Sequence, residues 1–433
     1  MLDIRLIREN PAKVRENIER RHDPSKLELL EQVIVDDGRW RELTTEINKL
    51  RRRRNIVSSE IGRLLKEGGD ASSLKQEADQ IPGMIKKVED ERNQVEERVR
   101  NGLMRLPNML HDSVPYGRDD AENVEIRRCG NPPKFSFQPK SHSEVAESLG
   151  IMDFERGGKV SGAGFYYLRN EMALLDYAIM CYAIDGLLSK GYTLIEPPYM
   201  IHRKPYEGVT DLGDFEQVMY KVEGEDLYLI ATSEHSMAAM LIDETINAED
   251  LPIRLVGVSP CFRREIGAHG KYTKGLFRVH QFNKVEQFIF SLPEQSWDLH
   301  EELQRNSEEL YEGLGLHYRV MNVCTGDIGS IAAKKYDTEV WMADGAFREV
   351  GSNSNCTDYQ ARRLNVRYRL KEGQAPAGFV HTLNNTALAT SRTMLAILEQ
   401  YQQADGSVMV PEVLRKYMKG MDRIDGSLNP LKQ

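Results

Sequence analysis

Two long heptad patterns near the N-terminus constrain the fold of this chain most strongly. Along two segments, about residues 39–66 and 70–100, hydrophobic positions recur in steps of four and three, the pattern of a coiled-coil seam. The seam positions are Leu43, Ile47, Leu50, Arg54, Val57, Ile61 and Leu64, then Leu74, Ala78, Ile81, Ile85, Val88, Arg92, Val95 and Val99. Only a short turn separates the segments, so the helices must run antiparallel. The sequence therefore predicts a helical hairpin, an arm of roughly 40 Å.

Pairing about this turn places Val57 near Ile81. Pro82 and Gly83 lie inside the second helix, where a proline removes a backbone hydrogen bond and favours a kink. Because the heptad register resumes after them, we expect a kinked arm. Residues 1–37 read as a helical lead-in, and we expect a helical domain over residues 1–110 with the arm at about 39–103.

Charge is unevenly distributed on the predicted hairpin. Residues 39–66 carry nine Lys and Arg against three Glu, including the run Arg51, Arg52, Arg53 and Arg54, whereas residues 70–100 carry eight acids against six bases. The run is either a solvated coiled-coil surface or a contact with a phosphate backbone. The net charge of −9 restricts any nucleic-acid surface to such a local patch.

The remainder, residues 111–433, alternates short strands and helices without a regular βαβ repeat. The strand candidates are residues 192–195, 227–230, 253–262, 277–290, 318–323 and 338–342. Several of them pair as hairpins, which predicts an α+β domain with an antiparallel sheet and flanking helices.

Composition places the chain among globular cytosolic proteins. Apolar residues make up 40% and charged residues 29% of the 433 residues, and the five cysteines show no paired spacing, which suits a reducing compartment. Charges at Asp3 and Arg5 argue against a signal peptide. The longest apolar run, residues 172–188, is interrupted by Asp176 and Asp185, so we expect a buried helix there and no membrane span.

Residues 260–286 carry the chemistry of a nucleotide and amine site. The segment reads as a strand, a basic glycine-bearing loop and a returning strand. Arg263 and Glu265 are expected to share one strand face, and Arg278, Phe282 and Glu286 recur every four residues on the return strand. Cations suit a triphosphate, an aromatic ring a nucleobase and a carboxylate an amine. The alternative is a charged hairpin on a solvated face.

Familiar nucleotide and hydrolase motifs are missing from the sequence. The nearest match to a P-loop has Glu265 where the first glycine belongs, and no strand-associated GxGxxG, HExxH or GxSxG occurs. Nucleotide chemistry here must use another scaffold.

Three segments together resemble the signature motifs of class II aminoacyl-tRNA synthetases. They are KGYTLIEPP at 190–198, the FRRE core at 262–265, and HTLNNTALATSR at 381–392 followed by AILE at 396–399. With TSE at 232–234, EVGS at 349–352 and the helical hairpin, the pattern is similar to the seryl-tRNA synthetase family. That resemblance implies the class II antiparallel sheet and covers essentially the whole chain.

The resemblance also implies site residues. Arg263 would bridge the ATP α-phosphate and the serine carboxylate, and Phe282 would stack under adenine. For L-serine it implies Thr232, Ser233, Glu234, Arg263, Glu286, Asn384 and Thr386. For ATP it implies Arg263, Arg264, Glu265, Arg278, Val279, Phe282, Glu349, Val350, Gly351, Ser352 and Arg392, with Glu349 and Ser352 as Mg²⁺ ligands. Arg263 and Arg392 would be the catalytic cations, and Arg51, Arg52, Arg53 and Arg54 would contact tRNA.

The implied activity is activation of L-serine with ATP to seryl-adenylate, then transfer to tRNA(Ser), and to tRNA(Sec) where it is present. The implied assembly is a cytoplasmic homodimer through the 172–188 helix and the segment at Pro198, with the loop at 266–274 meeting the tRNA acceptor end. Two alternatives stay open: a duplicated copy that serves antibiotic resistance or a biosynthetic pathway, and a non-catalytic RNA-binding paralogue.

Three departures from the family pattern bear on the ATP contacts. Arg264 stands where many relatives have a small residue, Gly351 replaces a frequent serine, and the third motif reads NNTALATSR. These variants are closer to archaeal or eukaryotic-type members. The charged positions named above are intact.

Overall fold

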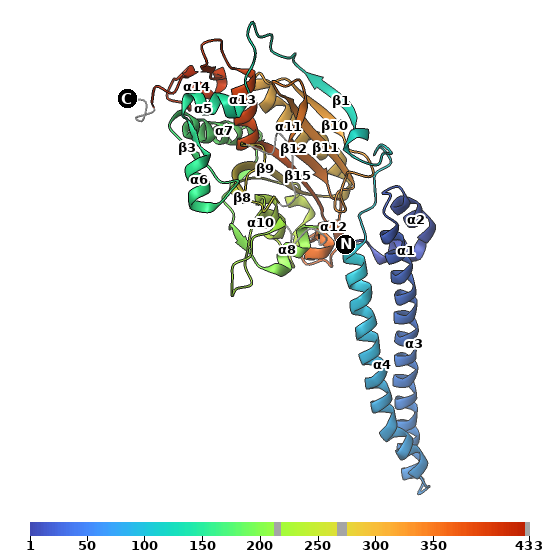
Figure 1. Cartoon of the computed structure of the whole chain (residues 1–433). Coiled ribbons are helices and arrows are strands. Elements are labelled where there is room, and N and C mark those ends of the chain that lie inside the picture. Colours follow the sequence, from blue (N-terminus) through green and yellow to red (C-terminus); the bar gives the residue numbers. More distant parts are fainter. Residues whose placement is uncertain (212–217, 266–274, 429–433) are drawn as a thin grey trace. The chain divides into compact units, whose positions relative to one another are not determined.

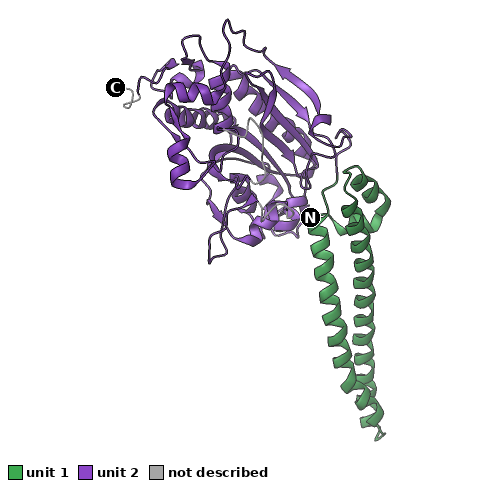
Figure 2. Ribbon diagram, in the orientation of Figure 1, with its two compact units in different colours: residues 1–109 green, residues 110–433 purple. Residues whose placement is uncertain are grey.

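The computed structural model describes residues 1–211, 218–265 and 275–428 (Figure 1). The chain divides into two compact units, Met1–Met109 and Leu110–Gln433 (Figure 2).

The first unit is entirely helical. Its helices are α1 (Ile4–Glu9), α2 (Pro11–Glu19), α3 (Pro24–Lys66) and α4 (Ser72–Arg105). The heptads predicted only the part of α3 after residue 39. The helix begins earlier because Asp23 caps it by accepting the Ser25 N–H and Pro24 occupies its first position. The additional turns pack on α1 and α2 through a core of Ile7, Val14, Ile18, Leu30, Val33 and Leu103.

The hairpin seam is confirmed. Val57, Ile81 and Ile85 are buried in one cluster between α3 and α4, and they are flanked by Leu50, Ile61, Leu74 and Ala78. The helix α4 continues through Pro82 without interruption, and the proline itself is exposed on the outer side. The arm is therefore one continuous helical pair.

The second unit is built on an eight-stranded sheet of order β1-β10-β11-β12-β15-β9-β8-β4. Its strands are β1 (Val124–Cys129), β10 (Tyr318–Asn322), β11 (Lys334–Trp341), β12 (Phe347–Asn355), β15 (His381–Ala389), β9 (Gln281–Ser291), β8 (Ile253–Phe262) and β4 (Thr193–Ile195). All neighbours are antiparallel except β4 and β8. The predicted α+β class with an antiparallel sheet is confirmed.

Smaller sheets and helices surround this sheet. The small sheets comprise β2 (Met152–Asp153), β3 (Tyr167–Leu168), β5 (Met200–Ile201), β6 (Tyr228–Leu229), β7 (Thr245–Asn247), β13 (Arg367–Arg369), β14 (Gly378–Phe379), β16 (Val408–Met409) and β17 (Arg423–Ile424). The α-helices are α5 (His142–Leu149), α6 (Phe154–Ser161), α7 (Glu171–Leu188), α8 (Arg203–Val209), α10 (Ser233–Ala239), α11 (Ser296–Gly313), α12 (Tyr359–Leu364), α13 (Thr390–Gln400) and α14 (Glu412–Arg415).

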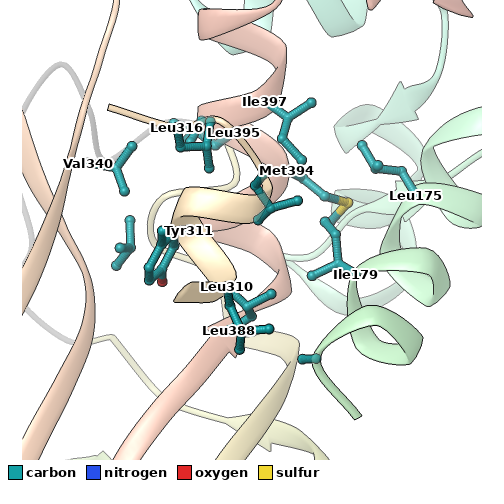
Figure 3. Packing of buried hydrophobic residues seen from close by; sticks show 14 of the residues in the cluster. Leu175, Ile179, Leu310, Tyr311, Leu316, Val340, Leu388, Met394, Leu395 and Ile397 are labelled. Carbon is teal, nitrogen blue, oxygen red and sulfur yellow. The ribbon is translucent and has the colours of Figure 1, made fainter. Parts of the chain in front are cut away.

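The two faces of the large sheet have separate cores. On one face, side chains of α7, α11 and α13 pack against strand residues such as Val340 and Leu388 (Figure 3). On the other face, α8, α10 and α12 pack with Phe288 and Phe290 around Tyr206 and Ile230. The helix α7 is largely buried, as its sequence predicts, and no helix in the described parts of the chain is long and apolar enough to cross a membrane.

Two differences from the predicted strands matter for the site. The return strand β9 begins at Gln281 and not at residue 277, because residues 275–280 form turns after β8 has ended at Phe262. The strands β12 and β15 were not predicted at all. They are rich in Asn, Ser and Thr, and they lack the apolar alternation by which strands are recognised.

Candidate active site

A cavity of about 360 Å³ opens over the middle of the large sheet. Twelve of the predicted site residues line it: Thr232, Glu234, Arg263, Phe282, Glu286, Glu349, Val350, Gly351, Ser352, Asn384, Thr386 and Arg392. Its walls also include residues 209–211 and 328–332. The fold thus brings together residues that lie more than 150 positions apart in the sequence.

An irregularity in β12 shapes one side of this cavity. Glu349 lies opposite Glu339 of β11, and Gly351 lies opposite Thr338, so Val350 is an extra residue between them. In a regular strand Glu349 and Ser352, three positions apart, would point to opposite faces. The extra residue puts both on the cavity face.

The strands β9 and β15 shape a second side of the cavity. Thr386 lies opposite Glu286 and donates a hydrogen bond from Oγ1 to its Oε2 at 3.3 Å. The Lys284 Nζ lies 2.5 Å from the same oxygen. Because side chains alternate along a strand, Phe282, Lys284 and Glu286 all face the cavity.

Glu234 enters from the first turn of α10. Thr232 caps this helix by accepting the Glu234 backbone N–H at 3.2 Å, so it is both a helix cap and a cavity residue. The Glu234 Oε1 accepts hydrogen bonds from Asn384 Nδ2 and Gln360 Nε2, each at 3.1 Å. Burial, and then the negative charge of Glu286, raise the pKa of Glu234 to about 7. An ammonium group placed beside both carboxylates would relieve this repulsion.

Two arginines also line the cavity. The Arg263 guanidinium lies 5.3 Å from the centre of the Phe282 ring. The Arg392 Nη1 donates to the Glu349 backbone carbonyl at 2.8 Å and lies 3.5 Å from its carboxylate. Partial desolvation in the cavity opposes ionisation of Glu349, whose side chain is 46% exposed, but attraction by Arg392 and neighbouring cations lowers its pKa, so that this carboxylate is ionised. The ring and the cations match the needs of a purine base and phosphates.

Five predicted site residues do not line the cavity. Ser233 and Val279 are buried, and the Ser233 Oγ donates to the Gly257 carbonyl at 3.4 Å. Arg264 is exposed and borders a separate hollow with Arg203 and Tyr220.

Glu265 and Arg278 pair with each other at 3.1 Å. The prediction that Arg263 and Glu265 share a strand face was wrong, because β8 ends at Phe262 and the Glu265 φ of 44° is left-handed. Arg278 likewise precedes β9, so of the three residues predicted on the return strand only Phe282 and Glu286 belong to it. The basic residues predicted at 266–274 lie outside the described part of the chain.

The four arginines of the arm have different environments, and Arg54, which the heptads place in the seam, is exposed. Arg51 pairs with Glu89 at 2.7 Å, and Arg53 pairs with Glu77 at 2.6 Å, so both link α3 to α4. In the described ranges, Arg52 has no ion pair or hydrogen bond. Since it lies opposite the seam on the α3 helical wheel, it faces solvent.

Several cavity residues were missed from the sequence. They are Asp211, His235, Lys284, Lys335, Ser354 and Cys356. Alternation along β9 between Phe282 and Glu286 was a signal for Lys284. No local pattern indicated Lys335 or Cys356, whose positions depend on how β11, β12 and β15 pair.

The residues present fit the implied Mg²⁺ ion. Glu349 and Ser352 present oxygen atoms on one face, and Asp337 lies opposite Ser352 with a buried Oδ1 that lacks a hydrogen-bond partner within the described ranges. No group of three or more His, Cys, Asp or Glu suited to a metal occurs among those residues. Mg²⁺ is usually bound by only one or two protein carboxylates when substrate phosphates complete its coordination.

Comparison with known families agrees with this geometry. Residues 218–401 match the tRNA synthetase class II core domain (G, H, P, S and T), which contains β8, β9, β12 and β15. The sheet and its cavity are therefore those of a class II tRNA synthetase. Residues 1–110 match the seryl-tRNA synthetase N-terminal domain. The serine–tRNA ligase of Methanospirillum hungatei is 57% identical, covering 96% of this chain and 99% of that protein. The chain belongs to the seryl-tRNA synthetase family.

Solved structures agree over the full length. The seryl-tRNA synthetase of Pyrococcus horikoshii, complexed with ATP, is similar with a TM-score of 0.96 and 47% identity, covering 98% of this chain and 99% of that one. The cytoplasmic enzyme of Naegleria fowleri, in complex with AMP, is similar with a TM-score of 0.88 and 38% identity, covering 98% and 99%. The resemblance inferred from the sequence is confirmed.

Proposed function

We propose that this chain activates L-serine with ATP to seryl-adenylate and transfers the seryl group to tRNA(Ser), and to tRNA(Sec) where that tRNA is present. One observation carries the proposal. A single cavity holds the buried carboxylate of Glu286, the partly buried carboxylate of Glu234, the Phe282 ring with Arg263 beside it, and Arg392. The carboxylates suit the amine of an amino acid, and the ring with its cations suits ATP.

The serine half of the site explains selectivity. Glu286 would accept the substrate ammonium, and Thr232, Asn384 and Thr386 surround the space beside it. A site that hydrogen-bonds a hydroxyl rejects an analogue without one, because its polar groups are left unpaired. Alanine should therefore be a very poor substrate.

The ATP half supplies positive charge where anions meet. Phe282 would stack on adenine, and Arg392 would contact the outer phosphates. Mg²⁺ held by Glu349 and Ser352 would offset phosphate charge. Attack of the serine carboxylate on the α-phosphorus brings two anions together, and Arg263 stabilises that approach. The protein supplies positioning and charge, and the mechanism requires no nucleophilic side chain.

A basic stripe on α3 is the proposed tRNA contact. Lys49, Arg52 and Arg63 are exposed and lie on the side of the helix opposite the seam, spaced by three and eleven residues. Arg51 and Arg53, which the sequence analysis grouped with Arg52, instead pair with carboxylates of α4. We propose that this stripe contacts the tRNA backbone, so that the protein recognises the tRNA by its shape and charge.

The paired variants R52A/R63A and R51A/R53A test this division. The first should leave serine activation and the unfolding of the arm unchanged and raise the KM for tRNA. The second should lower the arm's thermal stability, because it removes two links between the helices. Equal effects of the two pairs on charging would refute the division.

A homodimer through α7 and β4 is also part of the proposal. Tyr177, Leu188 and Leu194 expose apolar side chains on these neighbouring elements, with exposed fractions of 66%, 43% and 45%. The strand β4 is the edge of the large sheet. Such surfaces favour a partner. Sedimentation should give a dimer that L194D weakens, whereas a wild-type monomer at micromolar concentration would contradict it.

We further propose a cytoplasmic location. All five cysteines are free thiols, and Cys261, Cys324 and Cys356 are buried. A reducing compartment keeps such thiols unpaired.

Charging of total tRNA with radiolabelled serine tests the whole activity. We expect ATP-dependent, serine-specific charging. Serine activation without any charging would leave the duplicated-copy alternative as the better description.

A further inference from the structure

Lys284 occupies the middle of the cavity floor. It lies on β9 opposite Ser259 of β8 and Ala389 of β15, and its side chain is 7% exposed. Its Nζ lies 2.5 Å from Glu286 Oε2, yet the residue lines the cavity. Among the residues that the structure describes, this is the only ion pair of the Lys284 Nζ, so the ammonium retains N–H donors for a ligand.

Strand geometry places the reaction above this lysine. Phe282, Lys284 and Glu286 share one face at successive alternate positions, and a strand rises about 3.4 Å per residue. The backbone positions of Phe282 and Glu286 are therefore roughly 14 Å apart, with Lys284 halfway. If adenine stacks on Phe282 and the serine ammonium meets Glu286, the α-phosphate and the serine carboxylate lie over Lys284.

We propose that Lys284 is a further catalytic cation of serine activation, acting with Arg263 on the anions that meet at the α-phosphorus; this rests on the function proposed above. A serine carboxylate oxygen forms a bond to the α-phosphorus. The bond from phosphorus to the bridging oxygen of the departing pyrophosphate breaks, and that oxygen keeps the electron pair. No proton moves in this step.

Binding of the substrate frees the lysine for this role. The incoming serine ammonium becomes a second cation at Glu286 and competes with Lys284 for its carboxylate. The Lys284 ammonium can then turn from Glu286 toward the neighbouring anions. The competing explanation is that Lys284 serves only to neutralise Glu286 in the folded protein.

The two explanations predict different kinetics for K284Q. A catalytic cation contributes mainly in the transition state, so its loss should lower kcat of serine-dependent pyrophosphate exchange by about 100- to 1000-fold. The KM for serine should stay the same or fall, because Glu286 loses a competitor. K334Q is the control: it removes a lysine charge from the same unit at a residue that does not line the cavity, so it should keep wild-type kcat.

K284R and thermal unfolding complete the test. K284R keeps a cation at a shifted position, so it should recover part of the kcat lost in K284Q while serine KM stays near wild type. A kcat of K284Q within threefold of wild type, or a loss confined to serine KM, overturns the proposal. If K284Q does not fold, a K284R defect confined to serine KM overturns it equally. Failure of the wild-type protein to catalyse exchange would count against the proposed function itself.

Discussion

Replacement of Glu234 by glutamine should stabilise the unliganded protein while abolishing serine activation. The carboxyl is buried beside Glu286, and this environment raises its pKa from 4.5 to about 7. Glutamine has nearly the same shape and keeps an oxygen for the hydrogen bonds from Asn384 and Gln360. The variant therefore removes the charge and keeps the packing.

The sign and size of the effect follow from the pKa of Glu234 in the two states. The folded state holds this proton more tightly than the unfolded state, so the favourable contribution is present below pH 4.5 and is lost as pH rises through 7. With a pKa of 4.5 in the unfolded state and about 7 in the folded state, the ionised carboxylate lowers the free energy of unfolding by about 3 kcal/mol at pH 8.5. At pH 5 the same pKa difference lowers the free energy of unfolding by less than about 1 kcal/mol.

Urea unfolding of the wild type and E234Q at pH 5 and pH 8.5 measures this contribution. E234Q should be the more stable protein at pH 8.5, and the gain should shrink at pH 5. Serine at saturating concentration should raise the midpoint of the wild type at pH 8.5 more than that of E234Q, because in E234Q the ammonium has lost one of its two carboxylate partners. A gain that does not change with pH would refute the electrostatic explanation, and destabilisation at pH 8.5 would do so as well.

Two further outcomes follow from the cavity. A Cβ at Gly351 would lie 3.2 Å from the Thr386 Cβ, so G351A should raise serine KM by about tenfold through a displaced Thr386, while G83A, with nothing within 4 Å, should leave kinetics unchanged. Chelation with EDTA should stop pyrophosphate exchange until Mg²⁺ is restored, yet leave the unfolding temperature of the unliganded protein unchanged, because the described residues include no cluster suited to holding a metal alone.

Periodicity made the arm and the strand β8 predictable from the sequence. The seam residues Val57 and Ile81 meet as their heptad positions require, and β8 has the bounds its apolar run predicts. The start of α3 was missed because heptads begin at Leu43, although the Asp23–Pro24 capping signal was available. Local patterns thus identify regular elements and miss extensions that pack on other helices.

The cavity depends on strand pairing, which no local pattern encodes. Glu349 and Ser352 face the same side only because Val350 is an extra residue in β12. Lys284 contacts Glu286 on its own strand. Its position opposite Ala389 depends on the register between β9 and β15. The resemblance to a family supplied the identity of most cavity residues, and the structure supplied their relative positions.

Serine-dependent ATP–pyrophosphate exchange by the purified protein tests the central claim most directly. The assay should include alanine, threonine and cysteine beside serine at equal concentration. We expect rapid exchange with serine and at least about a hundredfold slower exchange with alanine. Absence of exchange with serine, or equal exchange with alanine, would contradict the assignment of this cavity to serine activation.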